Sequence, residues 1–433
     1  MYKPYDLNDF IQNGNNVNID SLKTTVFNIN TSGNIEITGK INGGMIAINT
    51  NNISKDINIA LNNVDLDTNS SSIPAIYVYN RDNTYDKTKV TIDVLDDTKN
   101  YINGGSLNKV SLIAKEDLEK TAYMSLENGQ SNYDLYTNYY GVYNSKEIAK
   151  ILFTKDVSDD DDLNDESPYY YYSATGAISS DIDLYFTGNG YLEITSKNAN
   201  GISTKGDLVL GNELGNYKII AKNNCLNIEN NKNNITVSVN SLIVNSLDNN
   251  SIDKNILSQN NLIVNNGNII ATNNAYNQVS KDSKQKSIIL SFDEEINAND
   301  VIVLTDSSDK VIFAYKADKP FNNLVYSGKS LTNGTYHLYK NGEIDGTLEN
   351  GLYNNIKSYK KDIQFIYFYE GIIVTDAIKE NIDDIVAPLP EIQKEKIVRN
   401  PDGSISIISV DYDSDFIIEK VVNYYGKIKT YSE

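Results

Sequence analysis

Two consecutive stretches decide the fold: GAISSDIDLYFTGNGYLEI at residues 176–194 and NGISTKGDLVLGNELGNYKI at residues 200–219. When they are aligned, Ile178 falls on Ile202, and Leu226 follows after the same interval of 24 residues. Each stretch contains short β-branched runs that are separated by Gly, Asn and Asp. Repeats of roughly 20 to 25 residues with this content are typical of the coils of a β-solenoid. We therefore predict an all-β fold, a right-handed parallel β-helix.

The same alternation of apolar and polar residues extends in both directions from these stretches. It is present in VFNIN (26–30) and KVTIDV (89–94), and SLIVN (241–245) recurs as NLIVN (261–265) at an interval of 20 residues. This period of two is typical of strands. An antiparallel sandwich gives frequent turn signals without such self-similarity, and a leucine-rich repeat needs a regular Leu framework that this chain lacks.

The prediction divides the chain into five regions. They are an N-terminal cap (1–23), a parallel β-helix (24–281) with a Tyr- and Asp-rich insertion (113–172), a C-terminal antiparallel β region (282–347), a linker with a helix candidate (348–390) and a small C-terminal β-meander (391–433). Within the insertion, AKEDLEKTAYMSL (114–126) is predicted as a short helix, and the helix candidate of the linker is TDAIKENIDDIV (375–386).

Composition excludes several classes of function. The net charge of −20 makes nucleic acid a poor partner, because an acidic surface repels phosphate. No apolar run reaches the length of a membrane span, and the first residues lack the features of a signal peptide. The single cysteine, Cys225, excludes an intrachain disulfide and is expected to be a small buried residue. The expected location is extracellular, on a cell surface or on a virion.

Several segments resemble a known family. Pro74 to Val78, followed by KVTIDVLDDTKNYINGGS (89–106), the two coil stretches and SIILSFDEEINANDVIVLTD (287–306) are similar to the clostridial-type carbohydrate-binding right-handed parallel β-helix family. The resemblance covers about 24–112, 173–220 and 282–342, over half of the chain, and the remaining segments depart from the pattern. It implies a pectate-lyase-like fold that binds calcium and carbohydrate without catalysis.

Two groups of acidic residues are candidate metal ligands, and Ca²⁺ is the one cofactor that they suggest. Asp159 and Asp161 belong to an acidic run that lacks EF-hand spacing, so a solvated acidic loop is the favoured explanation of this run. Asp181, Asp183 and Asp207 follow coil turns, where the resemblance implies calcium. Turn capping is the alternative role for each of these three carboxylates.

Tyrosines are the candidate carbohydrate-binding residues, because the chain has 32 Tyr and no Trp. An aromatic ring offers a large apolar face to a sugar, and the tyrosine hydroxyl can contact the sugar edge. The alternative is that they pack the insertion onto the β-helix or form an oligomer interface. The candidates are Tyr133, Tyr136, Tyr139, Tyr140, Tyr143, Tyr169, Tyr170, Tyr171 and Tyr172.

These features predict a surface-exposed adhesin that binds a polysaccharide or a cell-surface glycan and is not an enzyme. The alternative is a phage tail protein or another particle-borne structural or receptor-binding protein, whose C-terminal region contacts particle partners or further copies of the chain. A polysaccharide lyase is the third hypothesis. Its basic residue has no recognisable context at Arg81 or Arg399, and the single histidine, His337, cannot form a triad alone.

Overall fold

A computed structural model gives the fold of this protein. It describes residues 3–6, 25–68, 74–80, 88–105, 122–127, 130–131, 174–211, 213–229, 232–247, 262–272, 280, 282–332, 335–361, 366–370, 398–399, 405–408 and 420–424. Every regular element in these ranges is a strand, so the all-β class is confirmed. The chain forms two compact units, one of residues 1–248 and 253–262, the other of residues 249–252 and 263–433. In the described ranges, no helix has the length and hydropathy for a membrane crossing.

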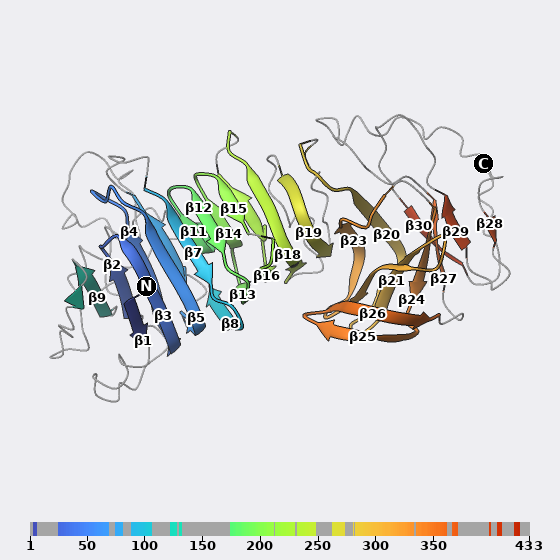
Figure 1. Ribbon diagram of the computed structural model, residues 1–433, viewed down its shortest axis with the longest axis horizontal. Coiled ribbons are helices and arrows are strands. Elements are labelled where there is room, and N and C mark those ends of the chain that lie inside the picture. Colours follow the sequence, from blue (N-terminus) through green and yellow to red (C-terminus); the bar gives the residue numbers. More distant parts are fainter. Residues whose placement is uncertain are drawn as a thin grey trace. The chain divides into compact units, whose positions relative to one another are not determined.

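The first unit consists of strands from successive coils of the chain (Figure 1). They pair in parallel, except that β9 and β10 are antiparallel. Its first eight strands are β1 (Lys3–Asp6), β2 (Thr25–Ile29), β3 (Gly33–Asn42), β4 (Gly44–Asn49), β5 (Ile57–Asp67), β6 (Ile76–Tyr79), β7 (Val90–Val94) and β8 (Lys99–Gly104). The others are β9 (Ala122–Glu127), β10 (Gln130–Ser131), β11 (Gly176–Ser180), β12 (Leu184–Thr187), β13 (Tyr191–Ser196), β14 (Asn200–Thr204), β15 (Leu208–Leu210), β16 (Asn216–Ala221), β17 (Leu226–Ile228) and β18 (Ile235–Ser246).

These strands form three stacks, which we call sheets 1, 2 and 3. Sheet 1 has the order β10-β9-β2-β4-β6-β11-β14-β17. Sheet 2 continues from β1 through β3, β5, β7, β12 and β15 to the first half of β18. Sheet 3 runs from the second halves of β3 and β5 through β8, β13 and β16 to the second half of β18. The predicted parallel coils and their 24-residue interval are confirmed, since Ile178 pairs with Ile202 and Ile202 with Leu226.

Strands such as β13 fill the interior with one side chain in two, whereas β4, β6 and β11 of sheet 1 are buried along most or all of their length. Burial along β13 alternates between half-buried and buried residues, as expected when one face of a strand meets the core. Equivalent side chains of successive coils stack into a continuous apolar row. The row of sheet 2 consists of Ile59, Ile92, Phe186, Leu210 and Val237, each at most 1 % exposed.

The helix predicted for residues 114–126 is wrong where the structure describes that segment. Residues from Ala122 onward form β9, which pairs in parallel with β2, so that Met124 lies opposite Phe27. The physical reason is that β2 presents an edge whose backbone groups need partners, and this pairing outweighs the weak helix propensity of a short segment. The linker helix candidate 375–386 lies outside the described residues.

The second unit is mainly antiparallel, as predicted for the region that follows the coils. Its strands are β19 (Leu262–Thr272), β20 (Ser287–Ile296), β21 (Val301–Asp306), β22 (Val311–Lys316), β23 (Phe321–Ser327), β24 (Thr335–Lys340), β25 (Glu343–Glu349), β26 (Leu352–Lys360), β27 (Ile366–Glu370), β28 (Val398–Arg399), β29 (Ile405–Ile408) and β30 (Lys420–Tyr424). The strands of the C-terminal tail join this unit: β29 pairs with β24, and β30 pairs with β27 and β20.

The hairpin of β25 and β26 covers one face of the second unit. Ile344 and Tyr353 of the hairpin pack against a buried cluster that includes Val303 and Tyr339. His337 lies beside this cluster in β24, with its Nδ1 atom 3.4 Å from Asp309 Oδ1. The alternation of apolar and polar residues in TYHLYK is therefore that of a strand.

Two glycines of the first unit provide a test of how closely the coils approach each other. Gly211 has φ of 109°, and a Cβ atom there would overlap the carbonyl oxygen of Ser238 in the next coil, whereas Gly33 has φ of 114° and open space. We expect Gly33→Ala to cost about 1–3 kcal/mol through backbone strain alone. Gly211→Ala should lower the midpoint of urea unfolding further. Equal effects of the two substitutions would contradict this close approach of the coils.

Candidate functional site

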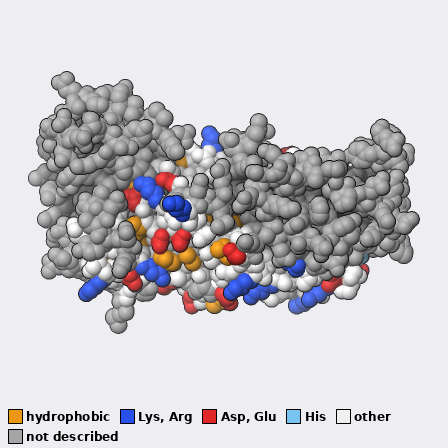
Figure 2. Space-filling view, turned by 90° about the horizontal axis from the view of Figure 1, so that it is seen from above, with side chains coloured by type: hydrophobic (Ala, Val, Ile, Leu, Met, Phe, Trp, Pro, Cys, Tyr) orange, Lys and Arg blue, Asp and Glu red, His pale blue; other side chains and the backbone are white. Residues whose placement is uncertain are grey.

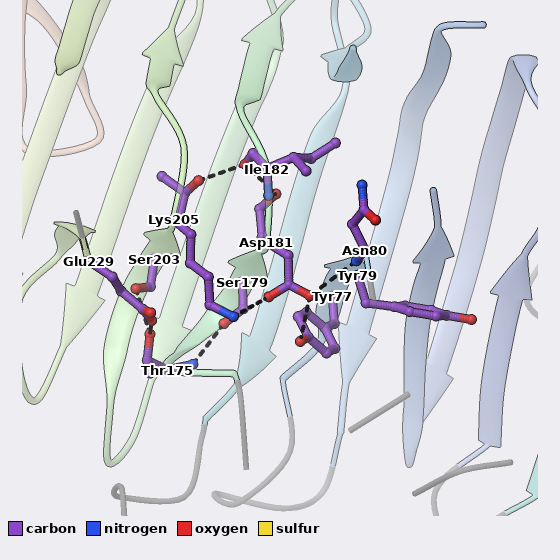
Figure 3. A network of polar contacts seen from close by, with 12 residues as sticks. Tyr77, Tyr79, Asn80, Thr175, Ser179, Asp181, Ile182, Ser203, Lys205 and Glu229 are labelled. Carbon is purple, nitrogen blue, oxygen red and sulfur yellow. Dashed lines mark hydrogen bonds and ion pairs between the residues drawn. The ribbon is translucent and has the colours of Figure 1, made fainter. Parts of the chain in front are cut away.

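The outer face of sheet 1 carries a network of polar contacts (Figure 3). It is formed by two rows of side chains that recur from coil to coil. The first row, within the strands, is Tyr77, Ser179, Ser203 and Asn227. The second row, directly after the strands, contains Asp181, Lys205 and Glu229. Because each member lies one coil from the next, residues 24 positions apart in the sequence become neighbours.

Asp181 is the centre of this network, and its side chain is only 5 % exposed. Lys205 of the next coil forms an ion pair with it, 2.7 Å between Nζ and Oδ1. Its second oxygen accepts hydrogen bonds from the Tyr77 hydroxyl and the Asn80 backbone amide, both at 3.1 Å. Three donors of the protein therefore compensate the burial of this carboxylate.

A directional chain of hydrogen bonds crosses the same face. Asn227 Nδ2 donates to Ser203 Oγ at 2.9 Å, and Thr175 Oγ1 lies 2.6 Å from both Ser203 Oγ and Glu229 Oε1. An ionised carboxylate only accepts hydrogen bonds, so the Thr175 hydroxyl donates to Glu229 and accepts from Ser203. These hydrogen bonds link side chains of three successive coils and help to hold the coils together.

Asp183 and Asp207, two of the predicted metal ligands, repeat the same contact in successive coils. Asp183 Oδ1 accepts a hydrogen bond from the Asp207 amide at 2.7 Å, and Asp207 Oδ1 accepts one from the Asn234 amide at 2.8 Å. Each carboxylate thus caps a backbone N–H at the start of the strand in the next coil. Calcium binding by these residues and by Asp181 stays a prediction, and within the described ranges no group of three metal-ligating side chains occurs.

The other predicted site residues lie outside the described residues. This holds for Asp159 and Asp161 of the acidic run and for all nine candidate tyrosines, Tyr133, Tyr136, Tyr139, Tyr140, Tyr143 and Tyr169 to Tyr172. Their roles in metal and carbohydrate binding stay predictions.

The outer face of sheet 3 carries a different set of side chains. Strands β8, β13 and β16 lie side by side, and each points one side chain in two away from the core. These side chains form three rows across the strands: Lys99, Tyr191 and Asn216; Tyr101, Glu193 and Lys218; Asn103, Thr195 and Ile220. We call this set the sheet 3 grid. It contains aromatic, acidic, basic and amide groups within a small flat area.

Two tyrosines of the sheet 3 grid, Tyr101 and Tyr191, form an aromatic pair. Tyr101 is 38 % exposed, and its ring centroid lies 6.2 Å from that of Tyr191 in an edge-to-face arrangement. The Tyr191 hydroxyl donates a hydrogen bond of 2.6 Å to Glu193 Oε2. Sequence reasoning missed this pair because Tyr101 and Tyr191 are far apart in the chain. The usable signal was their outward position in KNYING and YLEITS, two segments with strand alternation.

The described surface does not carry a uniform charge. Acidic, basic and hydrophobic side chains are intermixed over the part of one face that is visible in Figure 2. Cys225, the single cysteine, is fully buried, as the sequence suggested, and burial raises the pKa of its thiol to about 12. The thiol is therefore protonated at neutral pH and is not a nucleophile.

The ion pair of Asp181 gives a prediction about stability. Lys205→Met removes the cation from a buried carboxylate, and we expect a loss of about 1–3 kcal/mol in the free energy of unfolding. Lys40→Met is the matched control, since Lys40 and Asp65 also join neighbouring coils but their side chains are 70 % and 34 % exposed. Its cost should be much smaller, because an exposed ion pair contributes little to stability. Equal midpoints of urea unfolding for the two variants would contradict the role of Asp181.

Comparison with known proteins gives a match to a protein family. A family model described as carbohydrate-binding domain-containing protein matches residues 142–253, a minority of the chain. The described part of this segment contains β11 to β18, including Tyr191, Glu193 and Lys218 of the sheet 3 grid. No curated protein and no solved structure matches the chain. The match supports carbohydrate binding, and the description of the family names binding rather than catalysis.

Proposed function

We propose that this chain is a non-catalytic carbohydrate-binding protein that contacts its glycan with one outer face of the coils of the first unit. The observation that carries the proposal is the match to a carbohydrate-binding family over residues 142–253, which include the last three coils. The glycan partner is a polysaccharide or a cell-surface glycan, and the protein acts as an extracellular adhesin.

The arrangement of the strands supports this use. Parallel coils produce flat outer faces on which side chains repeat at the spacing of neighbouring strands, about 4.8 Å. Extended binding surfaces of this kind are characteristic of solenoid proteins. We infer that the coils form a right-handed parallel β-helix, because a connection between parallel strands of one sheet is right-handed in the great majority of cases.

Two further roles belong to the same proposal. Calcium would stabilise the coils through Asp181, Asp183 and Asp207, and the nine tyrosines of the insertion would provide a second aromatic surface for the glycan. Both roles rest on residue type and position in the sequence. A rise in the unfolding temperature on addition of Ca²⁺, reversed by a chelator, would support the first of them.

The alternative role as a particle-borne receptor-binding protein predicts a different assembly. A component of a phage tail or a similar particle would form a trimer or a larger oligomer, because closed symmetric assemblies are the usual form of such proteins. Size-exclusion chromatography with light scattering measures this directly. A chelator-independent oligomer would favour the alternative, and a monomer would count against it.

The test of carbohydrate binding is an array of plant, fungal and bacterial polysaccharides that is probed with the full chain. We expect saturable binding to at least one polymer, without release of unsaturated products or new reducing ends. Heat-unfolded protein is the control, because a folded outer face is required. The absence of binding to every polymer would contradict the proposed function, and the release of unsaturated sugars would favour the lyase hypothesis.

A further inference from the structure

Tyr101 is exposed in the middle of a strand whose flanking residues are buried. Burial along β8 alternates, with Asn100 and Ile102 buried on either side of this ring. Among the described residues, the large hydrophobic side chains that are exposed are Tyr101, Leu214 and Leu348, and Tyr101 is the aromatic one. An aromatic ring in this position leaves apolar area in contact with water, which a ligand with an apolar face can cover.

The ring of Tyr101 is supported by its neighbours. Tyr191 of the next coil contacts it edge to face, at an interplanar angle of 71°. The hydroxyl of Tyr191 is in turn held by Glu193, the residue that lies directly opposite Tyr101 in the strand register. Both tyrosines belong to strands that are paired on both edges, so little freedom remains to be lost when a ligand binds.

The polar groups around Tyr101 suit the edge of a sugar ring. Glu193 lies one strand away, about 4.8 Å, which is close to the width of a pyranose ring, and a carboxylate accepts hydrogen bonds from hydroxyl groups. Asn103, in the next row of the grid, can both donate and accept. An apolar platform with a few convergent polar groups is the usual composition of a small-ligand site.

The charges of the sheet 3 grid favour a neutral ligand. Glu193 lies between Tyr101 and Lys218 in the register, and on the other side of Tyr101 the carboxylate of Asp65 is paired with Lys40 at 2.5 Å. The row therefore has an acid on each side of Tyr101 and a base beyond each acid, so its charges balance. The net charge of −20 of the whole chain repels polyanions, including polymers of uronic acids.

We propose that Tyr101 is a stacking platform for one pyranose ring of a neutral polysaccharide and that Glu193 accepts hydrogen bonds from the hydroxyl groups of that sugar. Tyr191 is a positioning residue, which supports the ring of Tyr101 and orients the carboxylate of Glu193. This proposal rests on the proposed carbohydrate-binding function. It specifies the residues that contact the glycan and the class of glycan that is bound.

Affinity electrophoresis of the full chain in gels that contain hydroxyethyl cellulose, galactomannan or polygalacturonate tests the proposal. We expect at least one of the two neutral polymers to retard the migration of the protein. Polygalacturonate should not retard it. Tyr101→Ala should weaken binding to the neutral polymer about tenfold or more, because the apolar contact with the sugar face is lost. Tyr101→Phe keeps the ring and should stay within about threefold of the wild type.

Two further variants separate the site from general effects on the fold. Glu193→Gln should weaken binding about threefold to tenfold, because a neutral amide accepts weaker hydrogen bonds than a carboxylate. Tyr185→Ala is the matched control, since Tyr185 lies in β12 on the outer face of sheet 2, where the Lys89 Nζ atom is 4.2 Å from its ring centroid. It should bind as the wild type does. Circular dichroism and the unfolding temperature confirm that each variant is folded.

The outcomes distinguish this site from the proposed function. Undiminished binding of a neutral polymer by folded Tyr101→Ala overturns the site and leaves the carbohydrate-binding function in place. Retardation by polygalacturonate alone overturns the class of ligand. If the wild type binds no polymer in the gels and none in the array, both the site and the proposed function are overturned.

Discussion

The whole first unit depends on one constraint, the pairing of each coil with the next, residue by residue and in parallel. The backbone groups of an inner strand pair with those of the neighbouring coils, so each coil must repeat the outline of the one before it. Apolar side chains then stack on apolar ones, as Ile92 does on Phe186, and polar side chains stack on polar ones. Asn58 and Asn34, joined by an amide hydrogen bond of 2.8 Å, show the same rule on the outer face.

This constraint explains why the outer faces are chemically organised. A residue type that recurs at the coil interval becomes a row in space, and a change of type within a row places unlike groups side by side. On sheet 1 the change from Asp181 to Lys205 gives an ion pair whose carboxylate is buried. On sheet 3 the change from Tyr101 to Glu193 places an aromatic ring next to a carboxylate. The ion pair compensates the burial of the Asp181 carboxylate, whereas the arrangement on sheet 3 leaves the aromatic surface of Tyr101 in contact with water.

The two faces also differ in what they can offer to a ligand. The carboxylate of Asp181 already has three donors from the protein, so its contribution is mainly to hold neighbouring coils together. The carboxylate of Glu193 is half-buried and is oriented by the hydroxyl of Tyr191. An acceptor that is fixed in place beside an exposed ring loses little entropy on binding, which is the physical advantage of a site on a sheet over a site on a loop.

Period-two alternation and self-similarity are local properties of the chain, so the sequence predicts the all-β class, the parallel coils with their 24-residue interval and the antiparallel second unit. It did not determine that β9 pairs with β2, which requires knowing where a free strand edge lies. It also could not place Tyr101 beside Tyr191, because the two residues are brought together only when coils stack across the intervening insertion. Asp181 is predicted as a calcium ligand from its position after a coil turn, and that role stays a prediction, whereas its contacts with Lys205 and Tyr77 follow from the stacking of the coils. Contacts between coils depend on register, and register is a property of the stacked chain rather than of any one segment.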